Sequence, residues 1–369
     1  MTLLMNRSLH SYLSDWHKKM FKTILFSIFM SSSVLAGEYP TYWPWRGVNI
    51  PVDILEREKD VIKDLRKAKV NAVRIHMDYK KLMKLYQLDS NEVLELSITM
   101  TDNLLNQLAK NNMTAMLGIE VFPQEDLECN SKLDPIFWET KNCIDKMYEV
   151  AEKLTSYFKS RGNELAAYQF ISEPVVKIDG KSKRPENWVE IQSRLLQIVE
   201  KNDPERFFVI TAGPWGMPQG YKDFEPLPSN KVIYNAHFFQ PQRYTHQGIG
   251  KKAFDVVYPG WIKLKYWDKT KLEKSSSKLI KFQKKHDVPI LIGSFSKMNW
   301  IKDDNQWLID SLNIFENNQW SWLYFMVGED PWHGWDPRYI GDYEEKKINY
   351  FGETNTWKLL KEYFLTNQE

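Results

Sequence analysis

The sequence predicts an α/β fold of the (β/α)8 TIM barrel type, and three observations predict it. Short apolar runs alternate with amphipathic helical segments through most of the 369-residue chain. The runs are almost continuously apolar, which is typical of parallel strands buried on both faces. The pattern repeats often enough for eight strand–helix units. A doubly wound sheet is the second interpretation, but it usually carries an early glycine-rich nucleotide loop that this sequence lacks.

In the first half of the chain, predicted strands alternate with predicted helices. The segment 137–161 shows the helical period most clearly, because Met147, Ala151 and Leu154 recur every three to four residues. Gly162 follows this segment, and glycine commonly ends helices. We expect strands at 46–50, 72–77, 114–120 and 166–172, and helices at 53–69, 96–111, 137–161 and 188–201.

In the second half, the segment 288–296 is the most informative, and it reads VPILIGSFS. Its apolar run fits a buried parallel strand whose C-terminal end opens into a loop, which is where barrels place their chemistry. Ser294 stands at that end. A long loop is expected at 237–267. We expect strands at 207–211, 232–236, 289–293 and 321–326, and helices at 272–286, 306–317 and 356–365.

The chain is predicted to hold an N-terminal extension with a secretory signal peptide at 1–36, and one barrel domain at 37–369. Residues 17–22 are basic, 23–30 are apolar, and 31–36 end in a small-residue cleavage pattern at Ala36. The apolar run is too short to span a bilayer, and no second long run follows. We therefore expect the mature protein to be secreted or periplasmic, without a membrane span.

Composition excludes one class of partner and favours another. Lys and Arg number 50 against 48 Asp and Glu, and no basic block stands out, so we expect no nucleic-acid partner. The 15 Trp, 18 Tyr and 19 Phe are many for this length, and a surplus of aromatic rings near loops suits stacking on sugars. We expect a monomer that needs no cofactor.

Cys129 and Cys143 are the two cysteines of the chain. In an oxidising compartment, an even pair predicts one disulfide that closes a short loop. Two free thiols are the alternative.

Glu173 is the first candidate catalytic residue, because it directly follows a predicted strand in Ile171-Ser172-Glu173-Pro174. A carboxyl group at the C-terminal end of a barrel strand is a candidate general acid. The alternative is a glutamate that caps a helix or forms a salt bridge.

Several short motifs occur in order between Arg46 and Arg338, and with them the chain resembles glycoside hydrolase family 5, the cellulase-like retaining β-glycosidases. The resemblance rests on these motifs together rather than on any one. They are Arg46-Gly47-Val48-Asn49, Ala72-Val73-Arg74-Ile75, Ser172-Glu173-Pro174, His237-Phe238-Phe239, Tyr244-Thr245-His246-Gln247-Gly248, Gly293-Ser294-Phe295-Ser296, Trp320 to Tyr324, and Gly334-Trp335.

The resemblance implies a role for each matched position and reveals departures from the family pattern. Glu173 matches the acid/base. Ser294 stands where the family has its nucleophilic Glu, and Ser172 where it has an Asn that contacts the sugar. Phe239 replaces a Tyr that hydrogen-bonds the nucleophile, and Phe325 takes the place of an aromatic residue or His beside the reacting sugar.

The resemblance and the loop positions add further candidate substrate-binding residues. Arg74 matches the active-site Arg of the family, and we expect it to pair with Glu173 here. His237 and His246 are expected in the sugar cleft, and they lack a third ligand, so we expect no metal site. Three tryptophans in loops after predicted strands are the candidates for sugar stacking, namely Trp215, Trp332 and Trp335.

The replacement of the nucleophilic Glu by Ser294 bears directly on whether the chain can hydrolyse a glycosidic bond. Retaining hydrolysis needs two carboxyl groups about 5–5.5 Å apart, and a serine hydroxyl without an adjacent base cannot replace one. We therefore expect a protein that binds β-linked oligo- or polysaccharide without standard retaining hydrolysis.

Three alternatives stay open. The first is an active β-glucan or mannan hydrolase that uses Glu173 as acid and a more distant base, at about 6.5–9.5 Å. Candidates for that base are Glu120, Glu329 and Asp330. The second is a substrate whose N-acetyl group supplies the nucleophile. The third is an envelope protein that uses the barrel as a scaffold.

Overall fold

The computed structural model describes residues 39–367 apart from 124, 126–128, 130, 251–255, 329–333 and 343–346. The predicted signal peptide at 1–36 lies outside the described residues. Within the described part of the chain, each helix is too short or too polar to cross a lipid bilayer. The barrel lies within Tyr39–Glu369, which form one compact unit.

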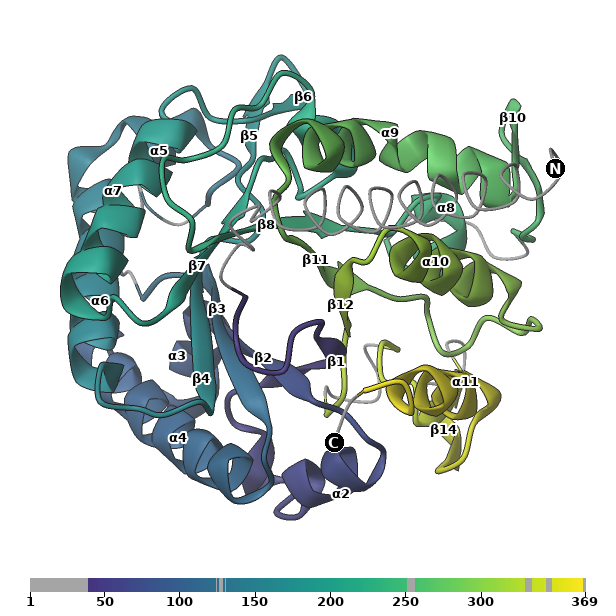
Figure 1. The fold of residues 1–369 in the computed structure, drawn as a ribbon, viewed down its shortest axis with the longest axis horizontal. Coiled ribbons are helices and arrows are strands. Elements are labelled where there is room, and N and C mark those ends of the chain that lie inside the picture. Colours follow the sequence, from purple (N-terminus) through teal and green to yellow (C-terminus); the bar gives the residue numbers. More distant parts are fainter. Residues whose placement is uncertain are drawn as a thin grey trace, which may run out of the picture. The chain divides into compact units, whose positions relative to one another are not determined.

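The strands close into a parallel barrel in the order β1-β12-β11-β8-β7-β4-β3-β2 (Figure 1). Each barrel strand pairs with the next one along the chain, and β1 pairs with β12 to close the ring. This confirms the predicted fold class. The barrel strands are β1 (Arg46–Pro51), β2 (Ala72–Asp78), β3 (Thr114–Val121), β4 (Leu165–Phe170), β7 (Phe207–Thr211), β8 (Val232–His237), β11 (Ile290–Phe295) and β12 (Ser321–Tyr324).

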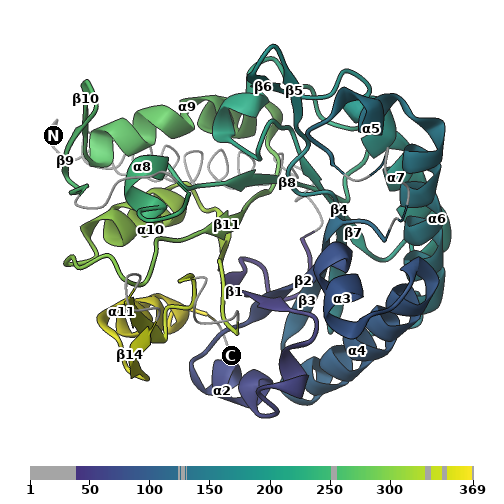
Figure 2. The same cartoon turned by 180° about the vertical axis from the view of Figure 1, so that it is seen from behind.

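Helices surround the strands, as Figures 1 and 2 show from opposite sides. Their apolar faces pack on the barrel; in α6, for example, Met147, Ala151 and Leu154 are fully buried. The helices are η1 (Ile54–Glu56), α2 (Val61–Lys67), α3 (Tyr79–Tyr86), α4 (Ser90–Lys110), α5 (Pro135–Glu139), α6 (Lys141–Phe158), α7 (Trp188–Asn202), η3 (Pro218–Tyr221), α8 (Gln242–Thr245), α9 (Lys269–His286), α10 (Gln306–Asn317) and α11 (Asn355–Phe364).

Two of the predicted helices are broken in the structure. The segment 53–69 forms η1 and α2, because Asp60 leaves the helical conformation and begins α2 as its N-cap. The segment 137–161 is divided into α5 and α6 at Thr140, whose backbone is extended. The first break spans residues 57–60, whereas the second is made by Thr140 alone.

Sequence periodicity did not predict three short hairpins in the segments that follow barrel strands. Most of their strands have three or four residues, which is too short for a periodic pattern. They are β5–β6 (Val176–Ile178 and Lys181–Lys183), β9–β10 (Gly260–Ile262 and Lys265–Trp267) and β13–β14 (Tyr339–Asp342 and Lys347–Phe351).

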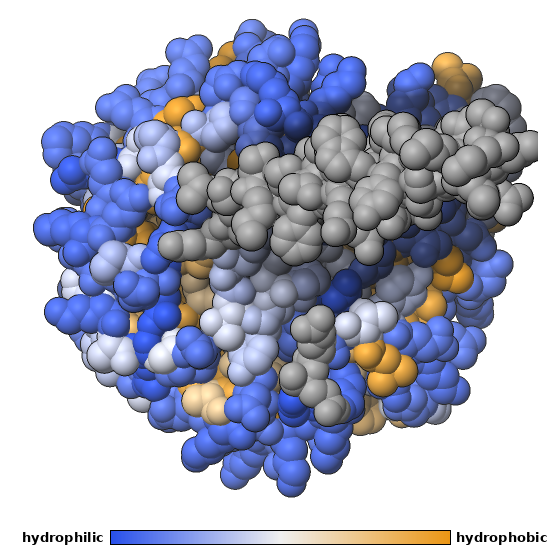
Figure 3. All heavy atoms as spheres, in the orientation of Figure 1, coloured by the Kyte–Doolittle hydropathy of each residue, from blue (hydrophilic) through white to orange (hydrophobic). Residues whose placement is uncertain are grey.

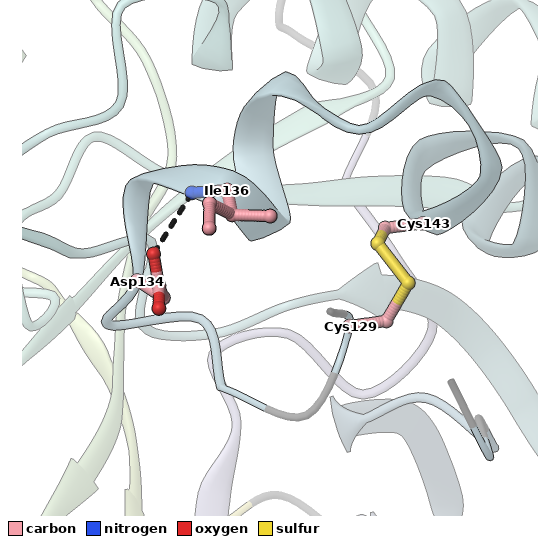
Figure 4. The surroundings of a disulfide bond; sticks show 4 residues. All are labelled: Cys129, Asp134, Ile136 and Cys143. Atoms are coloured by element: carbon pink, nitrogen blue, oxygen red, sulfur yellow. Dashed lines mark hydrogen bonds between the residues drawn. A yellow bond between two sulfur atoms is a disulfide. The ribbon is translucent and has the colours of Figure 1, made fainter. Parts of the chain in front are cut away.

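The connection between β3 and α6 carries a disulfide between Cys129 and Cys143, whose Cα atoms lie 5.4 Å apart (Figure 4). In the same connection, the carboxyl of Asp134 accepts a hydrogen bond of 3.0 Å from the amide of Ile136 and caps α5. The disulfide closes the loop that carries Lys132, a residue of the candidate site described next.

Candidate active site

A cleft of about 760 Å³ opens at the C-terminal ends of the barrel strands. It gathers residues from distant parts of the chain, because parallel strands in a barrel all end on one side. Ser172 lies beside it through a hydrogen bond to Glu120, while Trp332 lies outside the described residues. The lining residues are Arg74, His76, Glu120, Glu173, Lys177, Ser182, Trp215, Met217, His237, Phe239, Gln240, Gln242, His246, Ser294, Phe325 and Trp335.

Arg74 on β2 anchors one side of the cleft and is fully buried. Its guanidinium donates to Gln169 Oε1 at 3.0 Å, to Asn49 Oδ1 at 3.1 Å and to Glu120 Oε2 at 3.3 Å. Gly118 on β3 makes room for it, since a Cβ there would lie 2.3 Å from Arg74 Nε. The expectation that Arg74 pairs with Glu173 is wrong: among the described residues Arg74 forms its ion pair with Glu120, at the end of the neighbouring strand β3.

Glu120 is held by two cations and a hydroxyl. Lys132 Nζ lies 3.0 Å from Glu120 Oε1, and the Ser172 hydroxyl donates to Oε2. Burial raises the pKa of Glu120, but the charges of Lys132 and Arg74 outweigh it and hold the pKa well below its usual range. Glu120 is therefore ionised at any physiological pH. A carboxylate with so low a pKa is a weak general base.

His76, two residues after Arg74 on β2, is a cleft residue that sequence reasoning missed. Its Nδ1 lies 3.0 Å from Arg74 Nη1, and because arginine only donates, Nδ1 accepts and Nε2 carries the hydrogen. Burial, followed by the charge of Arg74, lowers the pKa of His76 to about 3. The available signal was the two-residue spacing, which places both side chains on one face of the strand.

Glu173 follows β4 and is held by His237 from the end of β8. His237 Nδ1 and Glu173 Oε1 lie 3.0 Å apart, so the ring donates when the carboxyl is ionised. His237 is 5% exposed and packs against Gly216, where a Cβ would come within 2.8 Å of the ring. The Nε2 atom of His237 is buried without a hydrogen-bond partner among the described residues.

Ser294 lies near the end of β11, in register with His237 on β8. It lines the cleft and is 4% exposed. The preceding residue, Gly293, is fixed by Asn235, whose Oδ1 accepts from the Gly293 amide at 2.8 Å. A Cβ at Gly293 would lie 2.3 Å from that oxygen, so the strand needs glycine here.

Four rings that line the cleft form a cluster. Trp335 is at the centre, with ring centroids 5.8 Å from Phe239, 5.0 Å from His246 and 5.8 Å from Phe325, and all three contacts are edge to face. His246 and Phe239 also contact each other at 5.2 Å. Phe239 and His246 follow β8, whereas Phe325 and Trp335 follow β12. The cluster therefore joins two segments that are about 90 positions apart in the chain.

Trp215, in the loop after β7, lines another edge of the cleft. Its indole N–H donates to Ser182 Oγ at 2.8 Å, and Lys177 Nζ lies 5.9 Å from the ring centroid. Both contacts come from the β5–β6 hairpin, so that hairpin fixes the orientation of the indole.

Within the described lining of the cleft, the carboxyl groups are those of Glu120 and Glu173. Glu120 is neutralised by Arg74 and Lys132, and Glu173 contacts a histidine. The side chain of Ser294 adds a hydroxyl, which has no hydrogen bond to a basic side chain among the described residues. The arrangement can donate one proton from Glu173, hydrogen-bond a polar ligand and stack on its apolar faces.

Comparison with known proteins gives one family. The family model of Cellulase (glycosyl hydrolase family 5) matches residues 34–331. Endoglucanase H of Acetivibrio thermocellus is 21% identical over 159 residues, which are 42% of this chain and 15% of that protein. The match thus spans a small part of that relative's length.

Solved structures agree on the architecture. A glycoside hydrolase of 21% identity superimposes with a TM-score of 0.66, covering 86% of this chain and 98% of its own. Cel5A of Thermotoga maritima, solved in complex with cellobiose, is 16% identical, with a TM-score of 0.62 and the same coverage of both chains. At these identities the likeness establishes the fold.

Proposed function

The chain belongs to the cellulase family, glycosyl hydrolase family 5, and we propose that it binds a β-linked oligo- or polysaccharide in the cleft without standard retaining hydrolysis. In this proposal Glu173 keeps the acid position, and Ser294 replaces the nucleophile. Retaining hydrolysis needs a second carboxylate that attacks the sugar, and in the part of the chain that the structure describes the serine hydroxyl has no partner that would ionise it.

One observation carries the proposal: the second carboxyl group in the described lining, Glu120, is already engaged. It accepts from Arg74, Lys132 and Ser172 at the same time. A nucleophilic carboxylate must have an oxygen free to attack, and a general base needs a pKa near the working pH. Glu120 meets neither condition.

The aromatic side of the cleft supports the binding half of the proposal. Phe239, Phe325 and Trp335 present a continuous apolar surface, and Trp215 faces the cleft from another edge. A pyranose has an apolar face that packs on such rings, while its hydroxyls need polar partners. Gln240, Gln242 and His237 supply those partners in the same cleft.

The competing function is hydrolysis by a non-standard route with Glu173 as general acid. The observation in its favour is that Glu173 is still held by His237 and remains 26% exposed to the cleft. Glu329 and Asp330, two of the candidate bases, lie outside the described residues. The third, Glu120, is disfavoured by its ion pairs.

The test compares Ser294→Glu with Ser294→Gln, which has the same size without the charge. Both are assayed with the parent for binding and for release of reducing ends from β-glucans, mannans and xylans. We expect the parent and Ser294→Gln to release nothing, and Ser294→Glu to gain measurable activity that Glu173→Gln removes. Hydrolysis by the parent that depends on Glu173 would establish the competing function.

We also propose that the protein is exported and works in the periplasm or outside the cell. The basic, apolar and small-residue pattern of 17–36 supports export. The bond between Cys129 and Cys143 is consistent with an oxidising compartment. N-terminal sequencing of the protein recovered outside the cytoplasm tests this, with a new terminus at Gly37 expected.

A further inference from the structure

The β9–β10 hairpin presents large apolar side chains that the barrel does not use. Leu264, in its turn, is 93% exposed, and Trp261 and Tyr266 on its two strands are 72% and 48% exposed. Most of the molecular face in Figure 3 is hydrophilic, with apolar residues scattered over it. Three such side chains on one short hairpin are therefore a cluster that needs an explanation.

The hairpin is firmly attached to the barrel. Ile262 on β9 is 6% exposed and joins the main core, and Trp267 packs against the same core. Asp268, directly after β10, caps α9 by accepting from the Lys271 amide at 2.8 Å. The exposed side chains thus stand on a fixed support at the start of a long helix.

The same region is basic. Residues 263–274, which are the turn of the hairpin, β10 and the first turns of α9, contain five lysines against two acidic residues, Asp268 and Glu273. Lys263 and Lys265 flank the exposed Leu264, and Lys271 Nζ lies 6.0 Å from the ring centroid of Trp267. Figure 1 shows the hairpin at the end of α9 where that helix begins. Apolar side chains and positive charge therefore share one part of the surface.

From this combination, we propose that the β9–β10 hairpin and the first turns of α9 bind the surface of an anionic phospholipid bilayer. Trp and Tyr favour the headgroup level of a membrane, and leucine favours the hydrocarbon below it. Lysines beside them are attracted to anionic headgroups. The attachment would be peripheral, and it requires no membrane-spanning helix.

The geometry favours lipid over a polysaccharide at this surface. The rings of Trp261 and Tyr266 meet edge to face, with an interplanar angle of 72°. The most exposed side chain, that of Leu264, has no stacking face and no hydrogen-bonding group. Insertion into a lipid interface needs exposed apolar volume, which Leu264 supplies.

The test uses Leu264→Cys in the full chain, labelled with an environment-sensitive nitrobenzoxadiazole dye. The two native cysteines are bonded to each other, so the new thiol is the labelling site. Residues 1–36 are the same in every variant, so their own affinity for lipid does not affect the comparison. The matched control is Leu365→Cys, whose native side chain is 69% exposed near the end of α11.

We expect the dye at position 264 to shift to the blue with vesicles of phosphatidylcholine and phosphatidylglycerol in equal parts, and much less with phosphatidylcholine alone. The dye at position 365 should not respond. Adding Lys263→Gln and Lys265→Gln should weaken vesicle binding about twenty-fivefold, at about fivefold per lysine, whereas Lys63→Gln with Lys358→Gln should not.

Three results would overturn the proposal. The first is no response at position 264 to the anionic vesicles. The second is an equal response at positions 264 and 365. The third is a response at position 264 to soluble β-glucan or to an anionic polysaccharide in place of the vesicles, which would assign the hairpin to a glycan.

Discussion

Two clusters meet at the cleft: in one, Arg74 and Lys132 both form ion pairs with Glu120; in the other, Phe239, Phe325 and Trp335 pack edge to face. We call these the charged wall and the aromatic wall. Almost every polar atom of the charged wall is engaged within the protein. The aromatic wall offers ring faces and no ionisable group of its own.

The difference shows that a charged carboxylate in a cleft is not necessarily able to act as a nucleophile or a general base. A catalytic carboxylate needs a tuned pKa and access to the reacting atom. Glu120 is charged because Lys132 and Arg74 outweigh the effect of its burial, and those same contacts occupy its oxygens. The charged wall therefore supports the barrel end, while the aromatic wall is where a ligand gains contact area.

The largest expected effect is on stability and comes from the charged wall. Replacing Arg74 by Met leaves Glu120 largely buried with one cation fewer and removes the donors to Gln169 and Asn49. Removing one partner of such a pair costs about 3–5 kcal/mol, and urea unfolding at neutral pH measures it. Adding Glu120→Gln should recover part of the loss. A cost below about 1 kcal/mol, within the range of surface changes, would mean that this wall does not support the fold.

The second effect is a pH dependence of the free energy of unfolding, and it comes from His76, which contacts Arg74 of the charged wall. Burial and Arg74 lower the pKa of His76 to about 3, against about 6.5 in the unfolded chain. The contribution of His76 is thus fully present above the unfolded value and is lost as pH falls, by about 1.4 kcal/mol per pH unit. Unfolding free energies measured from pH 6.5 to 4.5 should fall less steeply for His76→Asn. Equal slopes would contradict the assignment.

The smallest effect is on binding and belongs to the aromatic wall. Trp335→Ala removes the ring that contacts Phe239, His246 and Phe325, and we expect about tenfold weaker binding of an oligosaccharide, roughly 1.4 kcal/mol. Calorimetry measures it. Trp261→Ala is the matched control, because that ring is exposed on the β9–β10 hairpin outside the cleft lining. Equal affinities for the two variants would place the ligand elsewhere.

The barrel was predictable because its signals are local. The apolar run at 289–293 is long enough to identify β11, and α10 has the predicted limits of 306 and 317. The breaks at 57–60 and at Thr140 were not predictable, since each depends on backbone angles that the amphipathic pattern does not show. The three hairpins were missed because their strands are too short for a period.

The contacts in the cleft were less predictable than its members. Strand ends identify Arg74, Glu173 and Ser294 as neighbours, because all parallel strands end on one side. The positions of the strand ends do not indicate which carboxyl group forms the ion pair with Arg74. Its partner Glu120 is 46 residues away, and Lys132 reaches the same carboxylate from a loop held by a disulfide. Pairing of this kind depends on tertiary distances that no spacing in the sequence reveals.

The central claim is that the cleft holds a β-linked glycan and leaves it intact. The most direct measurement is to titrate the parent protein with a series of β-linked glucan, mannan and xylan oligosaccharides, and then to determine the chain length of the bound sugar by mass spectrometry. The account predicts saturable binding of at least one oligosaccharide, recovered at its original length after prolonged incubation. Shorter products that disappear in Glu173→Gln would contradict it.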